Sequence, residues 1–360
     1  MLRIEIETVW RFHREGSPQT VVVMLGILNE IRKTGKITNA ASEAHLSYRH
    51  VWNLLEQWSG FFGVPLVATH RGKGTKLTAF GEKLVWAGQR MQARLGPQLE
   101  NLAQELATEI KPLLHRPSVI RVHASHGFAV SKLRELLDRE PGIGVDLRYV
   151  SNQNSLVSLA QGACDLSGVH VPRGELRAQG IRACKEWLDP REDRVIRFVT
   201  REMGLMVKRG NPLKITSLKD LVDRKARFVN RDHDSGTRLL FDQLLALHNI
   251  DEAKIAGGQQ MEFTHAAVAA YVASGMADAS FGVEAAARQF GLDFVRLLTE
   301  DYFFVCKRTF LETEPMQRVL DIMKGSEFHE AVATLPGYIA SNSGAVSTVK
   351  EFLETMDASR

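Results

Sequence analysis

Residues 38–58 read TNAASEAHLSYRHVWNLLEQW, and this stretch decides how the whole chain is interpreted. Thr38 is a suitable N-cap for a short, alanine-rich helix over Asn39–Ala44, because a hydroxyl can accept a hydrogen bond from an unpaired N–H at a helix start. A tight turn follows, and Ser47 is the expected N-cap of a second helix, Tyr48–Trp58. Two short helices joined in this way are typical of a DNA-binding helix-turn-helix.

The second helix has an apolar face and a polar face. The apolar side chains recur at helical spacing: Val51, Leu54, Leu55 and Trp58. The polar side chains gather at its start: Tyr48, Arg49, His50 and Asn53. Arg49 can donate two hydrogen bonds to guanine, and Asn53 can pair with adenine, so this helix suits the major groove. The alternative is an ordinary amphipathic core helix whose polar side faces water.

The flanking residues complete a winged helix. We expect a helix over Ser17–Arg32 and two short strands, Leu66–Thr69 and Thr75–Thr78, joined by the basic turn RGKG at residues 71–74. Such a wing lies against phosphate or the minor groove. The predicted DNA contacts are Thr38, Ser47, Tyr48, Arg49, His50, Asn53, Arg71, Lys73 and Lys76.

The distribution of charge supports this interpretation. Residues 1–95 hold 13 Lys and Arg against 7 Asp and Glu, a net charge of +6, whereas the rest of the chain holds 33 against 35, a net charge of −2. A basic first quarter is suited to a polyanion.

Residues 37–58 and 63–84, which read ITNAASEAHLSYRHVWNLLEQW and GVPLVATHRGKGTKLTAFGEKL, resemble the winged helix of molybdate-responsive regulators and are similar to the LysR-type head. The resemblance spans roughly residues 16–90. It implies DNA contact by the start of the second helix and by the wing.

A long helical stretch follows, over Thr78–Ile110. Its apolar residues recur every three or four positions, which predicts helix pairing between protomers and therefore a homodimer or homotetramer. The alternative is that this stripe packs against its own head. Gly96-Pro97 interrupts the pattern, so one kinked helix and two helices both remain open. Lys111–Pro117 is expected to be a linker.

From residue 118, short strands alternate with helices, which predicts an α/β domain of parallel sheets in two lobes. The predicted strands are Val119–Ala124, Val145–Val150, Asp165–Val171, Gly204–Lys208, Arg227–Val229, Ala279–Val283, Phe294–Leu298 and Tyr302–Cys306. The expected organisation is a winged helix-turn-helix over residues 1–88, a linker helix over residues 89–117 and an effector-binding domain over residues 118–345.

Four polar turns lie where strands should end and helices begin, and helix N-termini there favour a small anion. The candidate ligand residues in these turns are Ser125, His126, Ser151, Asn152, Asn154, Ser235, Gly236, Thr237, Arg238, Thr264 and His265. The alternative is that the hydroxyls are ordinary helix caps. The triplet Asp232-His233-Asp234 holds metal-ligand residue types on a polar turn, and no metal site is expected there.

The segments FVTREMGLMVKRGNP (198–212), FVNRDHDSGTRLLFDQLL (228–245) and LDFVRLLTEDYFFV (292–305) resemble the periplasmic-binding-protein-like domain found beside molybdopterin and molybdate genes. The resemblance implies molybdate or tungstate as the effector and adds Tyr302 as a candidate contact. A small carboxylate such as formate would also suit the turns.

The chain has no P-loop, no GxSxG nucleophile elbow, no HExxH and no GxGxxG after a strand. We therefore expect a transcription regulator with no cofactor besides its effector, and not an enzyme; the alternative is an enzyme of molybdenum-cofactor chemistry. The N-terminus lacks an apolar signal region and the three cysteines form no CxxC, so a cytoplasmic protein with no membrane partner is predicted.

Overall fold

The computed structural model describes residues 4–14, 17–20, 22–70, 74–110 and 119–357. The chain divides into two compact units. One unit is Ile6–Leu95; the other is Gly96–Arg360 together with Met1–Glu5. We call the first unit the head and the second the effector domain.

Three helices and a hairpin form the head. The helices are α1 (Val22–Thr34), α2 (Ile37–Glu43) and α3 (Tyr48–Phe62), and the hairpin pairs β3 (Val67–His70) with β4 (Gly74–Leu77). Their buried side chains form one apolar core: Met24, Ile27, Leu28, Ile31, Ile37, Ala40, Ala41, Val51, Leu55, Trp58 and Leu66. The predicted order of helix, helix, helix and wing is therefore present.

The structure corrects two details of the predicted head. Residues Ser17–Thr20 are not helical but form strand β2, which pairs with β1 (Arg11–Arg14), and α1 begins only at Val22. The cause is the antiparallel pairing with β1, in which Arg11 is opposite Thr20 and Arg14 is opposite Ser17. Thr38 is not the N-cap of α2, since that helix begins at Ile37, two residues before the predicted Asn39, and Lys36 stands at the N-cap position.

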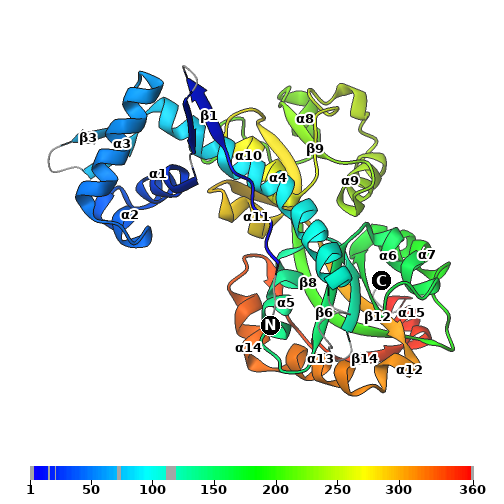
Figure 1. The fold of residues 1–360 in the computed structure, drawn as a ribbon. Coiled ribbons are helices and arrows are strands. Elements are labelled where there is room, and N and C mark those ends of the chain that lie inside the picture. The colour runs from blue at the N-terminus through cyan, green and yellow to red at the C-terminus, as the bar shows by residue number, and fades with distance from the viewer. Residues whose placement is uncertain (1–3, 15–16, 21, 71–73, 111–118, 358–360) are drawn as a thin grey trace. The chain divides into compact units, whose positions relative to one another are not determined.

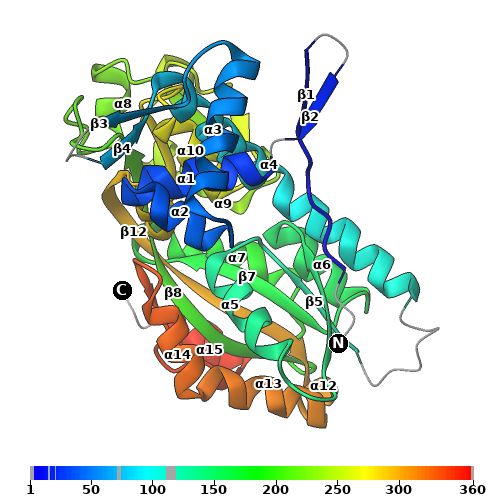
Figure 2. The same ribbon diagram turned by 60° about the vertical axis from the view of Figure 1, so that its left-hand side comes forward.

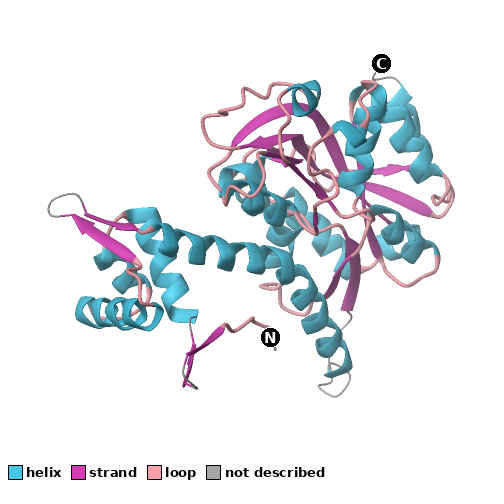
Figure 3. Ribbon diagram, turned by 90° about the horizontal axis from the view of Figure 1, so that it is seen from above, coloured by secondary structure: helices cyan, strands magenta, loops and turns pink. Residues whose placement is uncertain are grey.

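Residues Ala79–Ile110 form a single helix, α4, with Pro97 inside it (Figure 3). The structure therefore selects one helix over two. Its first part belongs to the head, where Trp86 lies 4.2 Å from the Arg32 guanidinium and Gln89 donates to Asn29 over 2.8 Å. Its second part belongs to the effector domain, where Asn101 exchanges hydrogen bonds with the backbone of Tyr149.

The effector domain is built on one mixed sheet in the strand order β10-β9-β11-β8-β12-β7-β5-β6. The strands are β5 (Val119–Ala124), β6 (Gly144–Tyr149), β7 (Leu166–Pro172), β8 (Asp193–Val207), β9 (Phe228–Arg231), β10 (Met261–Glu262), β11 (Ala279–Val283) and β12 (Asp293–Lys307). The short strands β13 (Tyr338–Ile339) and β14 (Val346–Thr348) also pair with β8.

Strands β8 and β12 run antiparallel through the whole domain (Figure 1). Lobe I is the half around the parallel strands β5, β6 and β7, and lobe II is the half around the parallel strands β9, β10 and β11. The α/β prediction holds, with a mixed rather than parallel sheet. Two strands expected at Phe294–Leu298 and Tyr302–Cys306 are one strand, β12, and β8 begins eleven residues before the predicted Gly204.

Helices cover the sheet of each lobe (Figure 2). In chain order they are α5 (Phe128–Leu137), α6 (Asn152–Ala160), α7 (Arg177–Lys185), α8 (Lys219–Asp223), α9 (Gly236–Leu247), α10 (His265–Ala273), α11 (Glu284–Gln289), α12 (Arg308–Leu311), α13 (Glu314–Lys324), α14 (Ser326–Ala333) and α15 (Val349–Asp357). Among the described residues, no helix is both long enough and apolar enough to cross a bilayer.

Candidate functional site

Helix α3 of the head presents its polar residues to solvent. Ser47 caps the helix as predicted, accepting a hydrogen bond of 3.2 Å from the backbone N–H of His50. The side chains of Arg49, His50 and Asn53 are exposed, while Val51 and Leu55 are buried against the head core. The start of α3 therefore offers donors and acceptors on an accessible surface, as a recognition helix requires.

The wing hairpin carries one described cation. Lys76 lies exposed on β4, whereas the predicted contacts Arg71 and Lys73 lie outside the described residues. A backbone hydrogen bond of 2.9 Å from Thr75 to the carbonyl of Gly35 ties β4 to the turn after α1. Gly74 has a φ of +81°, and a Cβ there would lie 2.7 Å from the Gly35 oxygen, so this position of the wing requires glycine.

Strands β8 and β12 pass side by side from one lobe to the other, and we call this part of them the strand crossing. It places charged residues in the interior of the effector domain. Arg201 on β8 is paired in register with Glu300 on β12, and its Nε and one terminal nitrogen donate to the carboxylate over 2.9 Å and 2.7 Å. Both side chains are more than nine-tenths buried. Burial opposes the charge of Arg201, but Glu300 holds the pKa of the guanidinium above its ordinary value.

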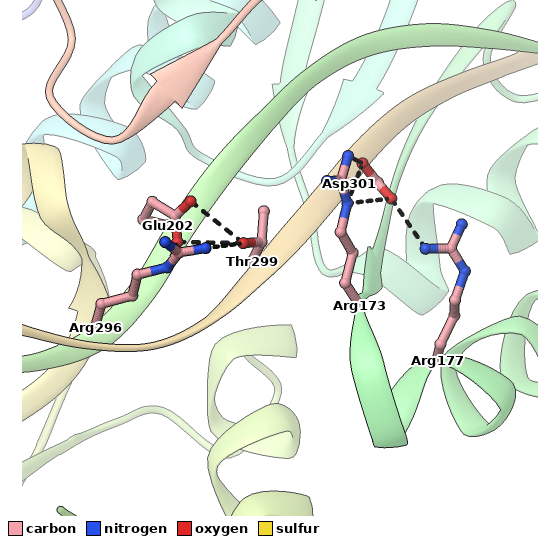
Figure 4. A network of polar contacts seen from close by, with 6 residues as sticks. All are labelled: Arg173, Arg177, Glu202, Arg296, Thr299 and Asp301. Carbon is pink, nitrogen blue, oxygen red and sulfur yellow. Dashed lines mark hydrogen bonds and ion pairs between the residues drawn. The ribbon is translucent and has the colours of Figure 1, made fainter. Parts of the chain in front are cut away.

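Ion pairs also stabilise the opposite face of the strand crossing (Figure 4). Neighbouring strand residues point to opposite faces, so Glu202 and Asp301 lie behind the Arg201–Glu300 pair. Asp301 accepts from Arg173 over 2.6 Å and 3.0 Å, and Glu202 contacts Arg296 at 2.5 Å. The central strands are thus fixed to each other by charge on both faces.

His170 of β7 lies on the same face as the Arg201–Glu300 pair. It is opposite Tyr302 in the register, and the two ring centroids are 3.8 Å apart. Asn152 at the start of α6 accepts from the backbone N–H of His170 over 2.8 Å and so fixes this strand. The imidazole is only 8% exposed, and neither ring nitrogen has a hydrogen-bond partner among the described residues.

Lobe II contributes Arg231 at the end of β9 and His265 at the start of α10. The Arg231 guanidinium is buried; it donates to the carbonyl of Phe263 over 2.8 Å and lies 3.5 Å from Asp232, but its Nε has no partner within the described residues. His265 Nε2 is 3.3 Å from the Thr237 hydroxyl, and its Nδ1 has no partner in the same part of the chain.

These groups influence one another electrostatically across the two lobes. Burial, assisted by the charge of Arg231, lowers the pKa of His126 to about 4. Burial and Arg201 lower the pKa of His170, and burial followed by Arg231 and Arg201 lowers that of His265. Burial lowers even the pKa of Arg231, to about 10. We call these five residues the basic cluster: His126, His170, Arg201, Arg231 and His265.

The predicted ligand residues have different roles in the structure. His126, His265 and Tyr302 lie in or against the basic cluster, with Thr237 bonded to His265. Helix capping occupies the hydroxyls of Ser151, Ser235 and Thr264, and Asn152 positions His170. An ideal Cβ on Gly236 would lie 3.7 Å from Asn152, so the turns before α6 and α9 approach each other. Ser125 precedes His126 in its turn.

Two predicted residues are not brought to the cluster. Asn154 is exposed on α6. Arg238 is buried, but its guanidinium is bonded to Asp242 over 2.8 Å and to Glu252 over 2.6 Å. These two carboxylates of lobe II already balance its positive charge. The cationic groups of the cluster are instead Arg201 and Arg231. Both were missed because they lie on strands, where no turn or cap marks them.

The described residues contain no group of three or more His, Cys, Asp and Glu side chains that could hold a metal ion. The imidazoles of the basic cluster are accompanied by two guanidinium groups, a donor set that suits an anion rather than a cation.

Comparison with known proteins defines the class. Residues 133–324 match the PBP superfamily domain, which is more than half of the chain, and residues 23–82 match the bacterial regulatory helix-turn-helix proteins of the lysR family. The chain therefore belongs to the PBP superfamily, and its head matches the helix-turn-helix of lysR-family regulatory proteins.

Individual relatives are more distant. The chain is 31% identical over 199 residues to the uncharacterized protein YvgK of Bacillus subtilis, covering 55% of this chain but only 64% of YvgK. It is 32% identical over 111 residues to an uncharacterized Clostridium pasteurianum protein encoded in the 5′ region of a 2Fe-2S ferredoxin gene, covering 31% of this chain and 98% of that protein. A peroxide-bound OxyR mutant from Corynebacterium glutamicum is similar with a TM-score of 0.45 and 14% identity, over 86% of this chain and 92% of that one.

Proposed function

We propose that this chain is a cytoplasmic regulator that binds double-stranded DNA through α3 and the wing, and that its effector domain senses a small anion at the basic cluster. Molybdate, tungstate and a small carboxylate such as formate are the candidate effectors, and genes linked to molybdoenzymes are the candidate targets. The observation that carries the sensing proposal is the buried Arg231 guanidinium, whose Nε has no partner among the described residues.

Electrostatics favours an anion at this place. A buried cation is costly unless an opposite charge and hydrogen bonds compensate it. Glu300 compensates Arg201, but the carboxylate beside Arg231 is 3.5 Å away, and burial lowers the pKa of this arginine. A bound oxoanion would supply the missing charge and accept from Arg231, from the imidazoles and from backbone N–H groups at nearby helix starts.

The position of the cluster suggests how binding could reach the head. His126 and His170 come from lobe I, Arg231 and His265 from lobe II, and Arg201 from a strand shared by both. An anion that contacts both lobes binds the closed arrangement better than an open one, and it shifts the population by that difference in affinity. Leu102 and Leu106 of α4 are exposed, which supports the proposal that α4 pairs in a homodimer or homotetramer.

A salt titration tests the DNA-binding part. Fragments of the genomic region around the gene are titrated with the full chain at several salt concentrations. We expect the affinity to fall steeply as salt rises, because phosphate contacts release counterions. Absence of retention even in dilute buffer would remove DNA binding from the proposal.

A thermal-shift panel tests the sensing part. Molybdate, tungstate, sulfate, phosphate and formate are each added to the full chain, and the unfolding temperature is followed over ligand concentration. A ligand that binds only the folded state raises this temperature progressively with its concentration. If none of the five anions produces a saturable shift, anion sensing by this domain is wrong.

A further inference from the structure

The imidazoles of the basic cluster present acceptors as well as donors. A neutral imidazole has one N–H donor and one nitrogen acceptor, whichever tautomer it adopts. Both ring nitrogens of His170 are without a hydrogen-bond partner among the described residues, so one of the two is an unmatched acceptor whatever the tautomer. A bare oxoanion offers acceptors alone and cannot satisfy this nitrogen.

The groups around His170 do not supply the missing hydrogen. Arg201 on β8 is bonded to Glu300, and on β12 the Tyr302 ring is tilted by 38° against the imidazole, with its hydroxyl bonded neither to His170 nor to any other described residue. Asn152 of α6 bonds to the backbone of His170 and not to its ring, and the ring of His265 on α10 bonds to the Thr237 hydroxyl. The ligand or a proton must therefore provide the donor.

We propose that the basic cluster binds its oxoanion together with one proton, carried either by the ligand as a hydroxyl or by the His170 imidazole. This inference rests on the proposed sensing function and specifies its chemistry. A hydrogen-bearing oxoanion donates its O–H to the neutral imidazole. With a bare dianion, the imidazole takes a proton from the buffer and then donates from both nitrogens.

The charge balance of the cluster points the same way. Glu300 neutralises Arg201, so with neutral imidazoles Arg231 is the one cation of the five-residue cluster left for the ligand, and Asp232 lies beside it. A bare dianion meets this one cation and leaves the acceptor nitrogen of His170 open to a proton, which adds positive charge, whereas the hydroxyl of a hydrogen-bearing anion already occupies that nitrogen. Burial and Arg201 keep the pKa of His170 low before binding, so the proton is absent at neutral pH until the anion arrives.

The sign of the pH dependence follows. The imidazole pKa is low in the unliganded protein and is raised by the bound dianion, so protons are taken up between these two values. In that window the affinity for a bare dianion falls about tenfold for each unit rise in pH. A ligand that brings its own hydrogen shows no such fall.

Calorimetry on the full chain measures this directly. Molybdate is the bare dianion and inorganic phosphate, at about pH 8, is the hydrogen-bearing one; each is titrated in two buffers with different ionisation enthalpies. We expect uptake of about one proton with molybdate and none with phosphate. Binding of molybdate without proton uptake and with a pH-independent Kd overturns this inference and leaves anion sensing intact. Absence of binding by both anions also overturns this inference, and anion sensing falls with it if none of the five anions of the thermal-shift panel binds.

Two variants assign the proton. His170→Gln keeps one donor and one acceptor but cannot titrate, and we expect it to lose the proton uptake and at least tenfold in molybdate affinity at neutral pH. His123→Gln is the matched control, because His123 is a partly buried histidine whose Nδ1 also lacks a partner among the described residues, but it lies on β5 beside Arg148 and Asp146. Proton uptake that survives in His170→Gln would remove the assignment to this residue.

Discussion

Helix α3 and the basic cluster are both rich in polar side chains, but they prepare those side chains for binding in opposite ways. On α3, Arg49 and Asn53 are exposed and separated by one helical turn, so water satisfies them until DNA arrives. In the cluster, His170 and Arg231 are buried, and each has at least one nitrogen with no hydrogen-bond partner in the described part of the chain. An exposed polar group exchanges water for its partner when it binds. A buried polar group that lacks a hydrogen-bond partner instead lowers the stability of the unliganded protein. Mutations should therefore weaken DNA binding at α3 without harming the fold, and should alter both stability and binding in the cluster.

The largest expected effect is on the buried pair at the strand crossing. Glu300→Gln leaves Arg201 without its countercharge and should lower the free energy of unfolding by about 3–5 kcal/mol. Chemical denaturation followed by circular dichroism measures this. Glu314→Gln is the control, because its partner Arg318 lies on the exposed face of α13. A change as small as that of the control would mean that Glu300 does not stabilise Arg201.

The next effect distinguishes two buried arginines of lobe II. Arg231→Met should weaken anion binding by about 2–5 kcal/mol, which is a loss of at least 30-fold in affinity, because it removes a buried charged donor. Arg238→Met removes an arginine that Asp242 and Glu252 already satisfy, so it should lower stability and retain the ligand-induced thermal shift. If instead Arg238→Met abolishes the shift, the sequence-based choice of Arg238 was correct and the basic cluster is misplaced.

A smaller effect is expected on the exposed surface. Arg49→Ala should weaken specific DNA binding by about 1–3 kcal/mol without changing the unfolding temperature. Fluorescence anisotropy with a labelled duplex measures the affinity. Lys33→Ala, which removes an exposed cation of α1 that pairs with Glu30, serves as the charge-matched control. Equal losses in the two variants would indicate general attraction to phosphate and not base recognition.

The smallest effect tests the helix caps of the head. Ser47→Ala removes the hydroxyl that accepts from the His50 N–H and should lower the free energy of unfolding by about 1 kcal/mol. Thr38→Ala should change it far less, since Thr38 lies within α2 and does not cap it. Thermal unfolding of the isolated variants compares them. Equal destabilisation would restore Thr38 to the role that its position in the sequence suggests.

The head could be predicted closely because its evidence is local. Helical spacing of Val51, Leu55 and Trp58, a serine cap and a glycine-containing wing are all visible within a few residues. The N-terminal hairpin was missed for the opposite reason: Ser17–Thr20 becomes a strand only by pairing with Arg11–Arg14, and this pairing leaves no periodic signal in a four-residue segment.

The centre of the effector domain could not be read in this way. Thr299, Glu300 and Asp301 resemble a polar turn between two strands, but they lie inside β12. Glu300 and Asp301 are buried there because arginines on β8, after β7 and on α7 meet them. Similarly, Arg231 and Arg238 stand seven residues apart, and only the folded chain shows which one has carboxylates around it. Ion pairs between distant segments are invisible to local periodicity.

The irregular pairing of β8 and β12 has a mechanical consequence. The register shifts between Arg296 and Leu298, where β12 has one extra residue, and again between Tyr302 and Phe303, where β8 has one, so two irregularities bracket the Arg201–Glu300 pair. An extra residue of this kind bends the strand that carries it and disrupts the ladder locally. We therefore expect the short segment between them to stay rigid and the strands to bend at its two ends. The two lobes could then move relative to each other without disturbing the Arg201–Glu300 pair.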